Sequence, residues 1–175
     1  MKGQPSRKYW VVVYFGLVAA AALALTVGSP PGVSGSPPES DPALQRTRDQ
    51  AKMLDDLFKV AVVDITERYD GPPAAKVAKA IFAAARDKQY FRAKLLDATG
   101  SPQNEANAPE DDFEKRAAQA VTSGKMYFEE VVGKGETRRL RVATAVPAVV
   151  RKCAKCHGVE QGELLGFLSY DLPIK

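Results

Sequence analysis

The sequence predicts an α+β domain, built from an antiparallel sheet of about four strands and from helices that precede it in the chain. Two helical patterns come first, over residues 43–69 and 74–87. Four short strand patterns occur later, and two of them are joined by a glycine-containing turn of about four residues. A turn of that length connects neighbouring antiparallel strands, so the hairpin indicates the type of sheet.

The N-terminal segment has the pattern of an exported protein. Three basic residues and no acidic residue precede an apolar run over residues 9–27. The run is longer than a usual signal core of about 7–15 residues and close to the ~20 residues that span a bilayer. Residues 1–28 are therefore expected to be an uncleaved membrane anchor, or else a signal peptide cleaved near Ala22-Leu23-Ala24. The basic end should stay in the cytoplasm.

Residues 29–42 are expected to form a linker, because a stretch so rich in proline, glycine and serine cannot build a core. Residues 43–175 are enough for one small domain with its own core. Of 25 basic residues three lie before the apolar run, so 22 basic residues face 21 acidic ones in the exported part. No basic face or charge block is present, and no nucleic-acid partner is expected.

Each predicted helix has one apolar face. The apolar face of the first helix, over residues 43–69, consists of Leu54, Leu57, Phe58, Ala61 and Ile65. Asp70-Gly71-Pro72-Pro73 ends this helix. The face of the second helix, over residues 74–87, consists of Val77, Ala80, Ile81 and Ala84. A third helix, over residues 109–123, is expected to bury Phe113, Ala117, Ala120 and Val121.

Strands are expected over residues 91–97, 126–132, 138–146 and 164–172. The turn at residues 133–136 joins the second strand to the third. Residues 148–163 then form the crossover between the third and fourth strands of the antiparallel sheet.

The crossover contains both cysteines and the single histidine of the chain, in the order Cys153-Ala154-Lys155-Cys156-His157. Two thiols three positions apart, followed at once by an imidazole, are typical of covalent attachment of a c-type haem. Each thiol adds to one vinyl group of the porphyrin, and the adjacent histidine binds the iron. Cys153 and Cys156 are therefore the predicted anchors of one haem c, and His157 is the predicted axial ligand. Covalent haem is assembled outside the cytoplasmic membrane, so the motif agrees with the predicted export.

Three other interpretations of the motif are weaker. A structural zinc site needs four ligands, and no second cysteine or histidine cluster exists. A thioredoxin-like dithiol would need a βαβ context with its first cysteine at a helix N-terminus. A plain disulfide would leave the adjacent histidine unexplained.

Further short stretches surround the motif in a recognisable order. Residues 95–100 read Leu-Leu-Asp-Ala-Thr-Gly and lead to Asn104, then to Asn107-Ala108-Pro109, with Phe113-Glu114 beyond. Residues 141–147 read Arg-Val-Ala-Thr-Ala-Val-Pro, and residues 166–170 read Gly-Phe-Leu-Ser-Tyr. From about Gln45 to the end, this order resembles the bacterial family of single-haem c-type domains with a PAS-like fold.

The resemblance implies a PAS-like sheet flanked by the N-terminal helices, with haem held between them. It also implies a periplasmic redox or ligand-sensing role, often next to a membrane segment. In some members of the family a cysteine on the first long helix binds the iron from the distal side. The present chain has no third cysteine, so its distal ligand is different or missing.

The sixth iron ligand cannot be a second histidine, because His157 is the only one. A thioether is the usual alternative. Met53 is the first candidate, since a sheet-borne His157 would leave the other haem face to a helix, on which Met53 is expected to turn towards the core with Leu57. Met126, at the start of the hairpin, is the second candidate. Each could instead fill a gap in the core, and a lysine, a tyrosine or an open site also remains.

Two further groups of side chains are candidates for haem contacts. Basic groups could bind the propionates, namely Arg138, Arg139, Arg141, Arg151 and Lys152. Aromatic groups could line the haem face, namely Tyr127, Phe128, Phe167 and Tyr170. The plain alternatives are solvated surface charge for the first group and core packing for the second.

The sequence favours a haem protein with a redox or electron-transfer role and a redox partner protein, on the periplasmic side of the membrane. The alternative is a redox or gas sensor that takes up a small gaseous ligand and acts through a partner protein. A sensor usually has a signalling domain across the membrane, whereas about eight residues precede the apolar run. An enzyme is not expected, because peroxidase chemistry needs a distal base such as histidine.

Overall fold

The computed structural model describes residues 41–70 and 74–175. The predicted anchor or signal segment (residues 1–28) and nearly all of the predicted linker lie outside the described residues. Within the described ranges, no helix combines the length and the apolar content that a bilayer crossing requires.

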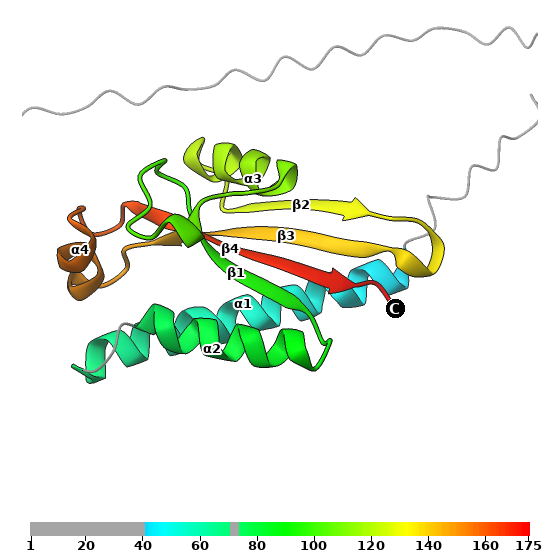
Figure 1. The fold of residues 1–175 in the computed structure, drawn as a ribbon, viewed down its shortest axis with the longest axis horizontal. Helices are drawn as coiled ribbons and strands as arrows, with labels where there is room; N and C mark the ends of the chain where they lie inside the picture. The colour runs from blue at the N-terminus through cyan, green and yellow to red at the C-terminus, as the bar shows by residue number, and fades with distance from the viewer. Residues whose placement is uncertain (1–40, 71–73) are drawn as a thin grey trace, which may run out of the picture. The chain divides into compact units, whose positions relative to one another are not determined.

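The core of the fold is a four-stranded antiparallel sheet, as predicted (Figure 1). Its strands are β1 (Arg92–Asp97), β2 (Tyr127–Val132), β3 (Arg139–Pro147) and β4 (Leu164–Pro173). They are arranged in the order β1-β4-β3-β2, so the last strand lies between the first and the third. The two inner strands share the longest ladder, from Arg139 opposite Pro173 to Pro147 opposite Leu164.

Helices cover both faces of the sheet. Helices α1 (Pro42–Arg68) and α2 (Ala74–Asp87) lie on one face, and α3 (Asp112–Thr122) lies on the other (Figure 1). Because successive strand residues point to opposite faces, each face has its own apolar cluster. The cluster under α1 and α2 includes Tyr170, Val142, Leu140 and Phe82. The cluster under α3 includes Phe167, Ala143, Ala145 and Phe113.

The helix ends follow from local capping. Asp41 accepts a hydrogen bond from the backbone N–H of Leu44 at 3.0 Å and starts α1. The third predicted helix begins three residues later than expected, at Asp112, because Asp111 and Glu114 form a capping box there. All four of its predicted core residues are buried.

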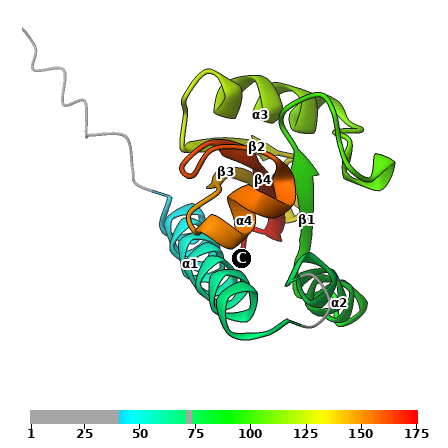
Figure 2. The ribbon, with the colours of Figure 1, turned by 90° about the vertical axis from the view of Figure 1, so that its left-hand side faces the viewer.

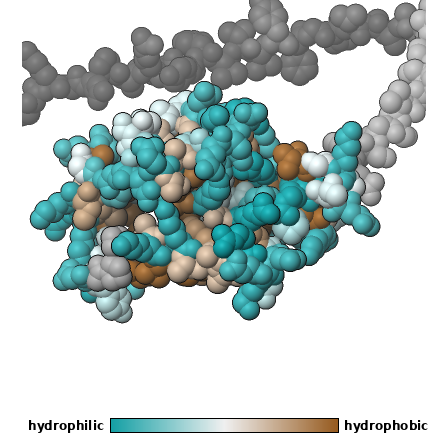
Figure 3. Space-filling model, in the orientation of Figure 1, coloured by the Kyte–Doolittle hydropathy of each residue, from teal (hydrophilic) through white to brown (hydrophobic). Residues whose placement is uncertain are grey.

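The apolar faces predicted for α1 and α2 are partly wrong. The buried residues of α1 are Thr47, Ala51 and Asp55, whereas Leu57 is 60% exposed. On α2 the buried residues are Ala74, Ala78, Phe82 and Ala85, and Ile81 is 43% exposed. In α2 the alanines on several sides hide the buried face from a periodicity argument. Its exposed side also carries apolar residues, as the pale brown surface near the bottom of Figure 3 shows.

The close packing of β1 against β4 yields a prediction about Gly166. A Cβ atom at this position would lie 2.1 Å from the backbone oxygen of Leu96, far inside van der Waals contact. We expect Gly166→Ala to lower the free energy of unfolding by about 2 kcal/mol, because backbone of the sheet must shift to make room. The urea midpoint measures this change. Ser101→Ala, in the exposed loop after β1, is the control, and equal midpoints for the two variants would contradict the prediction.

Candidate functional site

The predicted haem motif forms a short helix, α4 (Arg151–His157), on the crossover between β3 and β4. The crossover position was predicted, but the helix was not. Ala148 closes the neck of this connection: its N–H donates to the carbonyl oxygen of Glu163 at 2.8 Å, and its own carbonyl oxygen accepts from the N–H of Gly162 at 3.0 Å. The helix therefore projects from the end of the sheet on a closed loop (Figures 1 and 2).

The three motif residues are all reachable from solvent. Cys153 is half-buried, Cys156 and His157 are exposed, and both thiols are free. The cysteines lie about one turn apart on α4, and His157 is its last residue. Gly158 ends the helix in the left-handed conformation (φ 70°). The expectation of a sheet-borne His157 is therefore wrong, since the histidine belongs to a helix outside the sheet.

Helix α4 is anchored on two sides. Ala154 is buried. At the start of the helix, the Lys152 ammonium donates to Asp70 Oδ1 at 2.8 Å and to the carbonyl oxygen of Tyr69 at 3.3 Å, next to the end of α1. The hydrogen bond from Lys152 lowers the pKa of Asp70 below its usual value. Lys152, a predicted propionate partner, is thus already engaged with α1.

Three of the arginines proposed as propionate partners are held in ion pairs elsewhere. Arg138 pairs with Asp41, and Arg139 pairs with Asp171 at 2.5 Å. Arg141 pairs with Asp111 at 2.7 Å, and its guanidinium lies 4.3 Å above the centre of the Phe113 ring.

The candidate methionines and aromatic residues fall into different environments. Met53 is 55% exposed, so the expectation that it turns towards the core with Leu57 is wrong. The residues that α1 turns inwards include a carboxylate, which the apolar pattern could not reveal. Met126 is 62% exposed and lies beside a pocket. Phe167 and Tyr170 are fully buried in the clusters on opposite faces of the sheet.

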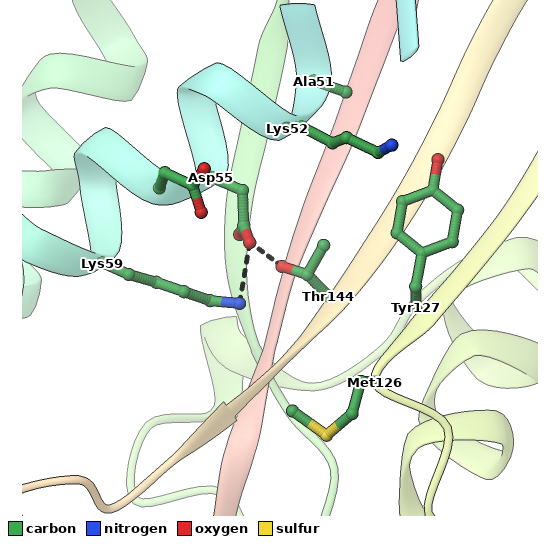
Figure 4. Close-up of a pocket in the computed structure, with 8 residues that line it drawn as sticks. Ala51, Lys52, Asp55, Lys59, Met126, Tyr127 and Thr144 are labelled. Carbon is green, nitrogen blue, oxygen red and sulfur yellow. Dashed lines mark hydrogen bonds and ion pairs between the residues drawn. The ribbon is translucent and has the colours of Figure 1, made fainter. Parts of the chain in front are cut away.

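This pocket lies between α1 and the strands β2 and β3 (Figure 4). Its volume is about 300 Å³. The lining residues are Ala51, Lys52, Asp55, Asp56, Lys59, Met126, Tyr127 and Thr144. Apart from the two predicted haem contacts, Met126 and Tyr127, sequence reasoning missed this group.

Asp55 forms the polar floor of the pocket. Its Oδ1 accepts hydrogen bonds from the hydroxyls of Thr144 at 2.5 Å and Tyr170 at 3.2 Å, and its Oδ2 accepts from the Lys59 ammonium at 2.8 Å. Asp55, Thr144 and Tyr170 are all buried. Burial, with the negative charge of Asp55 next to it, raises the pKa of Tyr170 above its ordinary value. The hydroxyl therefore stays protonated as a donor to the carboxylate.

A second polar group holds Tyr127, which lines the pocket. The Tyr127 hydroxyl donates to Glu129 Oε2 at 2.5 Å, and Arg48 donates to Glu129 Oε1 from Nε at 2.9 Å and from Nη2 at 2.5 Å. Burial and the bond to Glu129 raise the pKa of Tyr127 above its ordinary value. Burial also raises the pKa of Glu129, but the bonds from Arg48 and Tyr127 outweigh it and lower that pKa. Tyr127 is thus oriented by Glu129.

The Asp55 network should be important for stability. We expect Asp55→Ala to lower the free energy of unfolding by about 3 kcal/mol, because two buried hydroxyls lose their acceptor and Lys59 loses its partner. Chemical denaturation at neutral pH measures the change. Asp56→Ala is the matched control, because Asp56 is the exposed neighbour on the same helix and should cost less than about 0.5 kcal/mol. Similar losses in both variants would show that the network does not stabilise the fold.

Comparisons with known proteins place the chain in a family. A comparison with curated proteins finds no match. The crystal structure of the cyanobacterial heme-protein Tll0287 is similar at 16% sequence identity and a TM-score of 0.49, over 76% of this chain and 96% of that chain. The family model described as Tll0287-like matches residues 35–165, which is well over half of the sequence. The chain belongs to the Tll0287-like family.

Proposed function

We propose that the chain is an exported c-type haem protein with a redox or electron-transfer role. The observation that carries the proposal is the geometry of α4. Two free thiols lie about one helical turn apart, both reachable from solvent, and His157 follows the second one directly. The sequence contains no other cysteine or histidine.

The residues of α4 fit a covalently attached haem. Cys153 and Cys156 each supply a thiol that can add across a vinyl double bond, with sulfur on one carbon and the hydrogen on the other, so no oxidant is needed. His157 supplies a nitrogen ligand. A structural zinc site needs four ligands, whereas the sequence has two cysteines and one histidine, so zinc remains the weaker alternative.

The family supports the same proposal. The Tll0287-like family is named after a protein whose crystal structure is described as that of a cyanobacterial heme-protein. Haem binding is the property that we extend from that protein to this chain. Covalent attachment, export and the redox role rest on the sequence and on α4.

When bound, haem c supplies an iron that changes between the ferrous and ferric states. The protein would have to hold the imidazole of His157 in place during that change. The neck at Ala148, the burial of Ala154 and the contact between Lys152 and Asp70 restrict the movement of α4 and therefore of His157. We propose a redox partner protein as the electron donor or acceptor, and no enzymatic turnover at this site.

The central prediction is covalent haem. Expressed with a c-type maturation system, the protein should keep its haem stain through denaturing electrophoresis, because thioether bonds survive denaturation. Changing Cys153→Ser and Cys156→Ser together should abolish the stain. Ser101→Ala is the control and should stain like the unchanged chain.

The same assay tests export. Deleting residues 1–28 should keep the protein in the cytoplasm and remove the haem stain, because covalent attachment takes place outside the cytoplasmic membrane. A chain that matures without haem despite an intact motif would contradict the proposal. A stained protein that lacks residues 1–28 would contradict export alone.

The sixth ligand is a separate prediction. Met126 directly precedes β2, and its carbonyl oxygen accepts from the N–H of Ala145 near the end of β3, the strand that leads to α4. We therefore expect Met126→Ala, rather than Met53→Ala, to remove the near-infrared sulfur-to-iron charge-transfer band of the ferric protein. Loss of a thioether ligand should also lower the midpoint potential.

The reverse result would restore Met53 as the better candidate. If neither variant changes the spectrum and carbon monoxide binds the reduced protein readily, the sixth position is open. That result would favour the second candidate function, a gas or redox sensor that acts through a partner protein.

A further inference from the structure

The pocket between α1 and the hairpin strands has hydrogen-bonding capacity that the fold leaves unused. Both oxygens of its buried carboxylate already have partners. Asp55 Oδ1 receives the hydroxyls of Thr144 and Tyr170, and Oδ2 receives the Lys59 ammonium.

Its donors are not fully engaged. An ammonium group has three protons, and Lys59 directs one to Asp55. Lys52 is exposed and extends across the pocket towards Tyr127, and no hydrogen bond joins it to another of the described lining residues (Figure 4). Asp56 is the remaining acid of the lining, and it is exposed like Lys52, so water and salt screen both charges. The unused capacity near the floor is cationic and hydrogen-donating.

The rest of the lining is apolar. Met126, the ring of Tyr127 and Ala51 contribute surface without free polar groups, since the Tyr127 hydroxyl is directed to Glu129 at 2.5 Å. A volume of about 300 Å³ is at the lower end of the range for small-molecule sites. A fitting ligand therefore combines a small apolar part with an anionic, acceptor-only group.

We propose that this pocket binds a small organic carboxylate, with Lys52 and Lys59 donating to the carboxylate and Ala51 and Tyr127 packing against the apolar part. Two sources share this chemistry. One is a free organic acid, which would give the domain a second ligand besides haem. The other is a propionate of the attached haem itself, an alternative that rests on the proposed function. With a propionate bound to Lys52 and Lys59, the predicted propionate partners Arg138, Arg139 and Arg141 would be free for the ion pairs that they form with acids.

Isothermal titration of the haem-loaded full chain tests the proposal, with benzoate as the probe. Benzamide has nearly the same shape without the charge and is the matched control ligand. We expect benzoate to bind saturably and benzamide not to bind.

Lys52→Gln should weaken benzoate binding about tenfold, which is the effect of losing one hydrogen bond to a charged group. Lys52 is exposed, so this variant should fold normally. Lys115→Gln, on the exposed side of α3, is the control variant.

The two sources give different results. A free acid is indicated if benzoate binds the haem-loaded protein and Lys52→Gln weakens it. A haem propionate is indicated if benzoate binds only the haem-free Cys153→Ser/Cys156→Ser protein, and Lys52→Gln lowers the midpoint potential of the loaded protein, because a cation beside the propionate is lost.

Equal binding of benzoate and benzamide would overturn the proposal. An effect of Lys115→Gln as large as that of Lys52→Gln would overturn it as well. So would a Lys52→Gln protein whose benzoate binding and midpoint potential are both unchanged. The haem stain of the same preparation is measured separately, so absence of haem would refute the proposed function and leave the benzoate result to decide the pocket.

Discussion

The pairing of β3 with β4 is the constraint on which the rest of the structure depends. These inner strands pair from Arg139 opposite Pro173 to Pro147 opposite Leu164, and Ala148 extends the contact to Gly162 and Glu163. Their alternating side chains build both apolar clusters, with Val142 and Tyr170 on one face and Ala143 and Phe167 on the other. The same pairing closes the neck of the loop that carries α4. The most extensive hydrogen-bonded ladder in the sheet therefore determines where Cys153, Cys156 and His157 lie.

A buried carboxylate is the second organising feature. Asp55 joins α1 to both inner strands, because its oxygens accept hydrogen bonds from Thr144 on β3 and Tyr170 on β4. An unpaired charge in such a place would be costly, whereas three hydrogen bonds, one of them from Lys59, offset most of the desolvation. A buried carboxylate that needs three hydrogen bonds to offset its desolvation holds a helix on a sheet no better than an apolar contact would. It is more easily understood as the base of a polar pocket.

Local patterns predicted much of the fold, and contacts between distant residues account for what they missed. The strand patterns and the hairpin turn are local signals, and the four-stranded antiparallel sheet was predicted from them. The spacing of Cys153, Cys156 and His157 is also local, so the motif was visible without a structure. The orientation of α1 was not predictable in this way, because two of the three groups that compensate the buried Asp55 are hydroxyls 89 and 115 residues away. Met53 was placed on the wrong side of the helix for the same reason.

The two candidate functions place opposite demands on α4. A sensor has to pass a change at the iron to another part of the protein, and the contact of Lys152 with Asp70 at the end of α1 is the available route. That ion pair is exposed, with 97% of the Asp70 side chain accessible, so its contribution is small and it is easily broken. The neck at Ala148, by contrast, consists of backbone hydrogen bonds at a fully buried residue that continue the inner ladder. The backbone attachment of α4 therefore leads to the inner strands of the sheet, and the weaker ion pair leads to the end of α1. Under the proposed electron-transfer role, the first attachment would hold His157 in place.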